Sequence, residues 1–578
     1  MRRSCLSGGH PRTPGLVALV AALGLVFAAC GGGGGTKKEA GEATGNGKDG
    51  PSATAYDINP VDRDKVADGG QLSWPVTEMP PNLNYHHLDG TLRDTSDIMT
   101  ALMPSIFIFD AESVPSVNRN YVESADLTAT DPKQVVTYKF NPKAVWSDGT
   151  PITWADIEAQ WKAQSGTIAD YRISSKNGYE QIESVVKGAD DREAVVTYKQ
   201  PYTDWKGLFS PLYPASTNND PKVYNEGWIG KVPVTAGPFR FERIDETAKS
   251  LTIARDDKWW GDRAKLDRIV FRAIPSDGHI DALINGEVDF IDIGPDVNKL
   301  QRALGSPNLT IRKAAGPNFR HITINGTAEI LKDVKVRRAL AMAINRDQIA
   351  KTLLGPLGVE AKPLQNHLFM TNQKGYKDNA GVLSSPNADE AKKLLDEAGW
   401  KLEPNAEFRK KDGKELAVRF VIPSQVASSQ QESQLVFSML KTINVRVNID
   451  SVPSDDFFDK YINTGNFEFT VFSWIGTPFP ISSSKSIYAE PKGEDIQQNY
   501  ARIGSPELDA LFDKATSEFD EQKAIDIGNQ IDAMIWDEVH SLTLYQRPEI
   551  VATKSNLANF GAFGFATPPR YEDIGFTK

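Results

Sequence analysis

The chain has 578 residues, of which 40% are hydrophobic and 24% charged, and its formal net charge is −11 at pH 7. This composition is ordinary for a water-soluble globular protein, and the length predicts several lobes instead of one compact core. The acidic balance and the lack of a basic run argue against a nucleic-acid-binding protein.

The N-terminus is predicted to be a secretion signal. A basic start precedes the apolar stretch 16–29, which has the length of a signal-peptide core and is too short for a stable membrane span. The segment Phe27-Ala28-Ala29-Cys30 resembles a bacterial lipobox, with Phe27 where Leu is usual. We expect residues 1–29 to be removed and Cys30 to be lipidated, which would anchor the protein on the extracytoplasmic face of the cell membrane. The alternative is an ordinary signal peptide followed by a chance cysteine.

Residues 30–68 are predicted to form the lipid anchor and a flexible linker, because Gly, Lys, Glu, Ala and Ser dominate and apolar residues are few. The two cysteines are Cys5 and Cys30. The mature protein would therefore have neither a disulfide nor a thiol for catalysis or metal binding.

A strand, a turn and a helix start are predicted around residues 135–157. Residues 135–140 alternate as a half-buried strand does, and Ser147-Asp148-Gly149 is a turn signal. Thr153, followed three residues later by Asp156, predicts a capping box at a helix start. The string 140–157, FNPKAVWSDGTPITWADI, resembles the signature of the family 5 extracytoplasmic solute-binding proteins, the peptide/nickel-type receptors of ABC importers. A generic hairpin-to-helix junction is the alternative.

Later segments resemble the same family, in the family's order. They are 235–241 (TAGPFRF), 257–261 (DKWWG), 282–290 (ALINGEVDF), 336–346 (VRRALAMAINR) and 391–400 (AKKLLDEAGW). Two of them predict helices: one face of 336–346 is apolar, and Asn387 caps a helix that Gly399 ends. Most of these residues are expected to build turns and core instead of a site.

The resemblance implies an α/β protein of the two-lobed periplasmic-binding-protein type II (class II) fold, with a hinge and an extra small α+β domain inserted in the first lobe. The strand 319–325 would enter the second lobe at the hinge, and residues 542–545 would cross back. The expected organisation is lobe I at 69–105, 233–318 and 541–578, the inserted domain at 106–232, and lobe II at 319–540.

No motif indicates an enzyme. The chain lacks HExxH, a Walker loop, GxSxG and a dinucleotide fingerprint after a strand. His86 and His87 are adjacent, so their side chains point to different faces and are poorly placed to share a metal ion. We expect no catalytic residue, no metal and no cofactor.

The resemblance instead implies a ligand held between the lobes. In peptide-binding members, a Trp in the segment matching 472–477 is followed three residues later by an Asp that pairs with the α-ammonium of the peptide. Here Trp474 is present but Thr477 stands at the Asp position, so Asp89, Asp94 or Asp455 would supply the charge, or the ligand lacks a free ammonium. The expected ligand-binding residues are Phe472, Ser473, Trp474, Thr477, Tyr545, Asn84, Tyr85 and His86, with core packing as the alternative for Trp474 and Tyr545.

The expected function is capture of oligopeptides or peptide-like solutes by a monomeric, lipid-anchored receptor, which delivers them to the permease of an ABC importer. Two alternatives remain open. One is an LpqW-like accessory lipoprotein in cell-envelope glycolipid assembly, and the other is an oligosaccharide receptor. No nucleic-acid partner is expected.

Overall fold

The computed structural model describes residues 56–111, 113–566 and 570–578. The predicted signal peptide, the predicted lipidation site Cys30 and most of the predicted linker lie outside these residues. Among the described residues, no helix is both long enough and apolar enough to cross a membrane.

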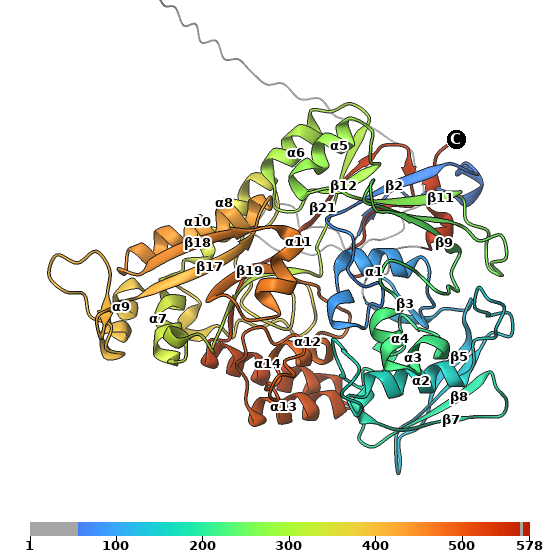
Figure 1. Ribbon diagram of the computed structural model, residues 1–578, viewed down its shortest axis with the longest axis horizontal. Helices are drawn as coiled ribbons and strands as arrows, with labels where there is room; N and C mark the ends of the chain where they lie inside the picture. Colours follow the sequence, from blue (N-terminus) through green and yellow to red (C-terminus); the bar gives the residue numbers. More distant parts are fainter. Residues whose placement is uncertain (1–55, 112, 567–569) are drawn as a thin grey trace, which may run out of the picture. The chain divides into compact units, whose positions relative to one another are not determined.

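Two sheets form the part that we call lobe I (Figure 1). In the four-stranded sheet, β2 is parallel to β11 and the other neighbours are antiparallel, whereas the three-stranded sheet is wholly antiparallel. The strands, in sheet order, are β2 (Gln71–Val76), β11 (Arg268–Ala273), β10 (Ser250–Arg255) and β9 (Phe239–Asp245), then β12 (Phe290–Asp292), β21 (Glu549–Lys554) and β13 (Leu309–Ala314). The accompanying helices are α1 (Arg93–Thr100), α5 (His279–Ile284) and α6 (Val297–Leu304).

A second four-stranded, antiparallel sheet forms the part that we call the small domain. Its strands are β5 (Val122–Ala129), β6 (Val135–Phe140), β8 (Glu193–Tyr198) and β7 (Ile182–Lys187), with helices α2 (Trp154–Gln164), α3 (Ala215–Asn218) and α4 (Pro221–Glu226) and the hairpin β3 (Phe107–Phe109)–β4 (Pro115–Val117). The predicted strand and capping box are confirmed, because β6 has the expected bounds and the Thr153 N–H donates to the Asp156 carboxylate at 2.8 Å.

A five-stranded mixed sheet with its helices forms lobe II. The strands, in order, are β18 (Arg446–Val452), β17 (Ala417–Pro423), β19 (Phe469–Trp474), β14 (Phe319–Ile324) and β20 (Ser541–Gln546). The helices are α7 (Val334–Ala343), α8 (Arg346–Leu354), α9 (Ala388–Glu397), α10 (Ala427–Lys441), α11 (Ser454–Asp456), α12 (Pro480–Tyr488), α13 (Pro506–Ser517) and α14 (Glu521–Glu538). Both predicted helices are present, and Asn387 caps α9 by accepting from the Glu390 N–H at 3.0 Å.

Lobe I and the small domain share one hydrophobic core. Trp74 and Phe271 of the lobe I sheet belong to the same cluster of buried side chains as Tyr138 and Trp205 of the small domain. Lobe II has a separate core around its sheet, which continues into the three-stranded sheet of lobe I, and a further cluster lies among α12, α13 and α14. The small domain is therefore packed as part of the lobe I body.

The chain passes between lobe I and lobe II at two adjacent places, which we call the crossing segments: residues 315–318, between β13 and β14, and residues 547–548, between β20 and β21. The Arg547 N–H donates to the Asn318 carbonyl at 2.8 Å. Gly316 lies so close to the other crossing segment that a Cβ there would stand 2.4 Å from the Arg547 carbonyl oxygen. The two segments therefore form one paired hinge.

A buried ionic network holds both crossing strands just inside lobe II. Arg320 of β14 and Tyr545 of β20 are paired in register, and both reach Glu432 of α10. Arg320 Nε lies 3.0 Å from Glu432 Oε1, and the Tyr545 hydroxyl donates to the same oxygen at 2.6 Å. Burial disfavours the charged guanidinium, but the Glu432 carboxylate outweighs that effect and raises the pKa of Arg320.

The predicted end of the flexible linker at residue 68 is wrong. Strand β1 (Asp57–Ile58) pairs with β23 (Gly561–Ala562), and the Asp57 carboxylate lies 3.0 Å from Arg312 Nη1. The folded part therefore includes residues that the sequence assigns to the linker, because their partner strand lies about five hundred residues further along the chain.

The predicted return to lobe I at residues 542–545 is also wrong. β20 is antiparallel to β14 in the lobe II sheet, and the chain leaves lobe II only after Gln546. The apolar pattern of this strand identified it as buried but could not identify the sheet to which it belongs.

The network around Glu432 should be essential for stability. Glu432→Gln leaves the buried Arg320 charge uncompensated, so we expect it to lower the free energy of unfolding by about 3–5 kcal/mol. The matched control is Glu415→Gln, which makes the same change in an exposed ion pair with Arg446 and should have little effect. Denaturant unfolding monitored by circular dichroism measures both, and equal losses would contradict the assignment.

Candidate functional site

The predicted segment 472–477 runs from the end of β19 to the hinge. Phe472 is buried, while Ser473, Trp474 and Thr477 are half-buried. Gly476 donates its N–H to Asn318 Oδ1 at 3.3 Å, and a Cβ at this position would stand 2.1 Å from the Pro317 carbonyl oxygen. Only glycine allows this approach, so the segment is fixed against the first crossing segment.

Trp474 is the centre of an aromatic stack in lobe II. Its ring is stacked on His321 at 5.4 Å and on Tyr500 at 5.6 Å, and Phe472 packs edge-on against it at 5.1 Å. Burial lowers the pKa of His321 well below its usual value, so its ring is neutral. The Tyr500 hydroxyl has no hydrogen-bond partner among the described residues. The stack combines apolar faces with one spare hydroxyl, a combination suited to an organic ligand.

Thr477 starts the turn that carries Phe479, and Phe479 contacts the small domain. Its hydroxyl oxygen accepts a hydrogen bond from the Phe479 N–H at 3.1 Å, which fixes the turn into α12. The Phe479 ring then packs edge-on against Phe109 of the small domain at 5.5 Å. The hydroxyl is neutral, so Thr477 cannot supply the negative charge that the family places here.

The predicted residues of the turn 84–86 have structural partners. Asn84 is fully buried and its amide oxygen accepts from the His86 N–H at 3.1 Å, while the Tyr85 N–H donates to the Tyr213 hydroxyl at 2.8 Å. Burial lowers the pKa of His86 to about 4, so this ring is neutral at pH 7. Among the described residues, no hydrogen bond, ion pair or ring contact joins this turn to the segment 472–477.

The structure places Tyr545, predicted as a ligand-binding residue with core packing as the alternative, in the core of lobe II. Tyr545 is fully buried inside lobe II, and its hydroxyl is engaged by Glu432.

Each of the three acids proposed as substitutes for the missing Asp has a partner. Asp89 lies 2.9 Å from Arg172 Nη1, and Asp94 accepts backbone N–H groups of the turn after β2. Asp455 of lobe II lies 4.0 Å from Lys249 Nζ of lobe I. Burial is the main cause that raises the pKa of Asp94, to about 6.

Glu78, which follows β2 in lobe I, was not predicted from the sequence. Its half-buried carboxyl has no hydrogen-bond or ion-pair partner among the described residues. Burial raises its pKa to about 8, helped by the charges of Asp94 and, from lobe II, of Asp455 and Asp459. Nothing in the local pattern separates this glutamate from an ordinary surface acid, because its surroundings come from the other lobe.

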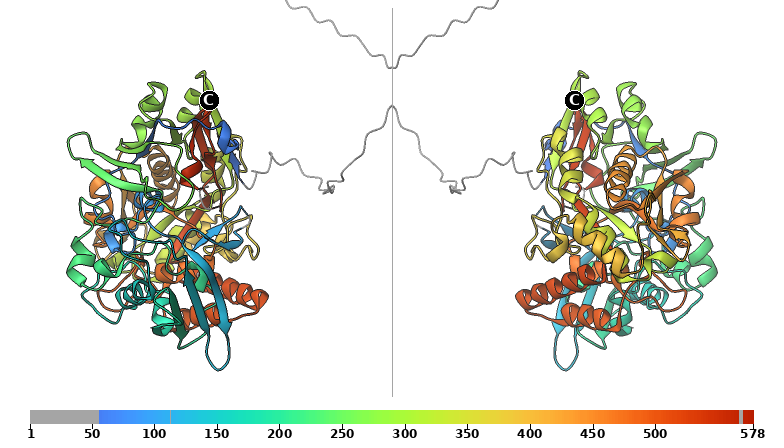
Figure 2. Two further views of the ribbon diagram at one scale, coloured as in Figure 1. Left: turned by 90° about the vertical axis from the view of Figure 1, so that its right-hand side faces the viewer. Right: turned by 90° about the vertical axis from the view of Figure 1, so that its left-hand side faces the viewer.

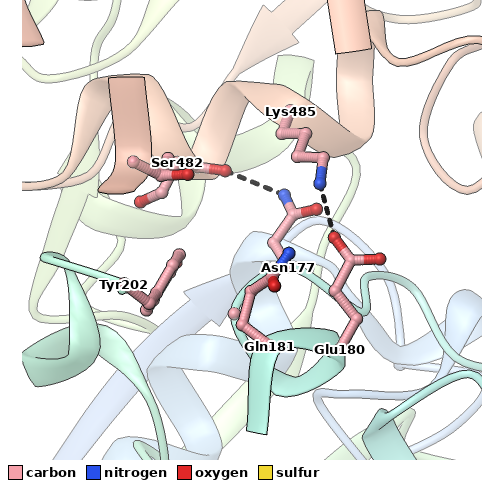
Figure 3. A pocket seen from close by; sticks show the side chains of 8 residues that line it. Asn177, Glu180, Gln181, Tyr202, Ser482 and Lys485 are labelled. Carbon is pink, nitrogen blue, oxygen red and sulfur yellow. Dashed lines mark hydrogen bonds and ion pairs between the residues drawn. The ribbon is translucent and has the colours of Figure 1, made fainter. Parts of the chain in front are cut away.

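The small domain meets lobe II at contacts that we call the seam (Figure 3). Asn177 Nδ2 donates to the Ser482 carbonyl at 2.8 Å, and Lys485 Nζ contacts the Glu180 carboxylate. These residues line a narrow pocket, and none of the sequence-predicted ligand residues lines it. Among the described residues, no group of His, Cys, Asp and Glu side chains is arranged to hold a metal ion.

The sequence matches the model of one family and several known proteins. The profile of "Bacterial extracellular solute-binding proteins, family 5 Middle" matches residues 116–494. The oligopeptide-binding protein OppA of Mycobacterium tuberculosis is 39% identical over 529 residues, which cover 91% of this chain and 88% of OppA. The probable monoacyl phosphatidylinositol tetramannoside-binding protein LpqW of the same organism is 27% identical over 343 residues, which cover 58% of this chain and 53% of LpqW.

The structure has the two-lobed class II fold that the sequence predicts. The oligopeptide-binding protein AppA of Bacillus subtilis, solved in complex with a nonapeptide, superposes with a TM-score of 0.77 at 20% identity. The match covers 89% of this chain and all of AppA. At this identity the likeness establishes the fold alone.

Glu78 should make stability depend on pH in a defined direction. The folded state holds the proton up to about pH 8, whereas the unfolded state releases it near pH 4.5, so stability falls as pH rises through this window. Glu78→Gln removes that loss, so the melting temperature of the variant relative to wild type should increase between pH 5 and pH 8. Glu246→Gln, in the exposed turn between β9 and β10, is the control. A difference that stays constant with pH would contradict the burial of Glu78.

Proposed function

The chain belongs to the bacterial extracellular solute-binding proteins of family 5, and we propose that it captures oligopeptides or peptide-like solutes and delivers them to the permease of an ABC importer. It is a binding receptor and not an enzyme. The observation that carries the peptide assignment is the 39% identity to an oligopeptide-binding protein along 91% of the chain.

The wall of the proposed site is the aromatic stack beside the hinge. Trp474 and Tyr500 supply faces that accept side chains of many shapes, because apolar and stacking contacts need little directional match. The chain leaves the β19 ladder after Trp474, at the lobe boundary, where an extended peptide can meet it. Closure of the two lobes about the paired hinge would then enclose the ligand and give the permease a ligand-dependent shape.

Because Thr477 is neutral, the negative charge that pairs with the ligand's α-ammonium must come from another residue. We propose that Glu78 supplies it, together with Asp455 and Asp459 across the lobe boundary. Glu78 and Asp459 have no ion-pair partner among the described residues, whereas Asp455 lies near Lys249. Glu78 is the one whose pKa is raised to about 8, and a nearby cation would favour its ionised form. A bound ammonium would thereby offset the burial and the like-charge repulsion that together raise the pKa of Glu78.

The place of action is proposed to be the outer face of the cell membrane. Family membership supports an extracytoplasmic location. The predicted lipobox supports attachment through Cys30, and the polar stretch after it would serve as a tether. Mass measurement of the mature N-terminus tests this point, because a diacylglyceryl group on Cys30 supports the anchor and an unmodified cysteine refutes it.

The alternative with support is an LpqW-like role in envelope glycolipid assembly. LpqW matches 58% of the chain at 27% identity, less of the chain and at lower identity than OppA. Native mass spectrometry of the purified chain, followed by denaturing release, distinguishes the two. Released peptide masses support the peptide receptor. A glycolipid or oligosaccharide mass, or a bare chain that shows no thermal shift with a random-sequence peptide pool, refutes it.

Trp474 should contribute strongly to peptide affinity. Trp474→Leu keeps apolar bulk but removes the stack, so we expect about a tenfold loss in affinity, typical of an aromatic anchor. Phe519→Ala, an exposed aromatic between α13 and α14, should leave affinity unchanged. Isothermal titration of a peptide recovered from the native complex provides the comparison, and equal affinity of Trp474→Leu and wild type would remove Trp474 from the site.

Glu78 should discriminate between free and blocked peptides. Glu78→Gln should weaken binding of a peptide with a free α-ammonium and leave its N-acetylated form almost unaffected, because only the former requires the counter-charge. Competition measured with both forms tests this. An equal loss for the two peptides would assign Glu78 a structural role alone.

A further inference from the structure

The seam is distinct from the hinge and lies between helices of lobe II and loops of the small domain. Figure 2 shows the orange helices α13 and α14 close to the blue-green strands of this domain. The Thr203 N–H of the small domain donates to the Thr516 carbonyl at the end of α13, at 2.8 Å. With the contacts from Asn177 to Ser482 and from Lys485, this bond connects the lobe I body to lobe II at a second place.

Lys485 is the charged centre of the seam. Its ammonium lies 2.5 Å from Glu180 Oε1 of the small domain and 2.7 Å from Asp513 Oδ1 of its own lobe, and its side chain is 13% exposed (Figure 3). Burial disfavours the ammonium, but the Glu180 charge and then the bond to Asp513 outweigh that effect and raise the pKa of Lys485. The lysine therefore stays charged throughout the physiological pH range.

The seam has no apolar core of its own. The buried cluster of the small domain continues into lobe I, and the cluster of α12, α13 and α14 stays within lobe II. The apolar contacts across the seam centre on Phe479, whose ring packs against Phe109 and lies close to Gly207. The contacts of Asn177 and Lys485 are polar. Polar contacts exchange for water at small net cost, so a surface of this kind can separate and re-form.

We propose that the seam is a closure latch, in which Lys485 exchanges its contact with Glu180 for water as the lobes open and remains on Asp513 in both states. Because Asp513 belongs to the same lobe, it holds the ammonium in place while the small domain moves away. Closure then re-forms the ion pair with Glu180 while the Lys485 side chain is already ordered, so the entropic cost of closure is smaller. The proposal deepens the proposed function, since it identifies what holds the closed form at the edge away from the hinge.

Hydrogen exchange at the Thr203 amide reports opening of the latch without any ligand. This amide is protected by a bond that crosses the seam, so its exchange rate follows the fraction of molecules with the seam open. Lys485→Met in the full chain should raise that rate about three- to tenfold, as expected for loss of one partly buried ion pair. Glu180→Gln should act similarly, and the double variant should exceed neither single variant by much, because both remove the same pair.

Lys514→Met is the matched control. Lys514 lies on α13 in a surface depression beside the seam, which Gln181 and Pro201 of the small domain also line. It has no ion-pair partner among the described residues. Its Thr203 exchange should equal wild type. Exchange in the β14–β19 strand pair should stay unchanged in all variants, which excludes general destabilisation. Unchanged exchange in Lys485→Met, or an equal rise in Lys514→Met, would overturn the latch. Because the readout requires no peptide, its result is independent of whether the chain binds peptides.

Discussion

The buried network of Arg320, Glu432 and Tyr545 is the constraint on which the rest of the structure depends. It joins the two strands by which the chain enters and leaves lobe II to one helix of that lobe, with an ion pair that is almost fully excluded from water. The buried Arg320 and Glu432 can move little relative to each other. If they separated, each charge would be buried without a partner and would carry its full desolvation cost. We therefore expect motion between the lobes to be confined to the short crossing segments outside the network.

The distribution of apolar and polar contacts separates what is rigid from what can move. Lobe I and the small domain share one core, and the main core of lobe II continues into the three-stranded sheet of lobe I, while a further cluster stays within lobe II. Between these bodies, away from the hinge, the contacts are mainly ion pairs and hydrogen bonds, such as those of Lys249 with Asp455 and of Lys485 with Glu180. This pattern suits a receptor that must open for its ligand and close on it.

Sequence alone was sufficient for the elements whose signals are local. The strand β6, the capping box at Thr153 and the cap at Asn387 depend on residues within a few positions of each other, and all were predicted. The pairing of Asp57 with the C-terminal strand β23, the sheet membership of β20 and the burial of Tyr545 depend on segments far apart in the chain. The environments of Glu78 and Lys485 also could not be predicted from the sequence, because charged groups of the opposite lobe contribute to them.

The central claim is that the two bodies close about the paired hinge on a peptide. Small-angle X-ray scattering of the purified chain, with and without a saturating random-sequence peptide pool, tests it most directly. We expect a smaller radius of gyration with peptide, and no such change with an equal concentration of free amino acids. A radius of gyration that stays the same while native mass spectrometry of the same sample shows bound peptide would contradict the account.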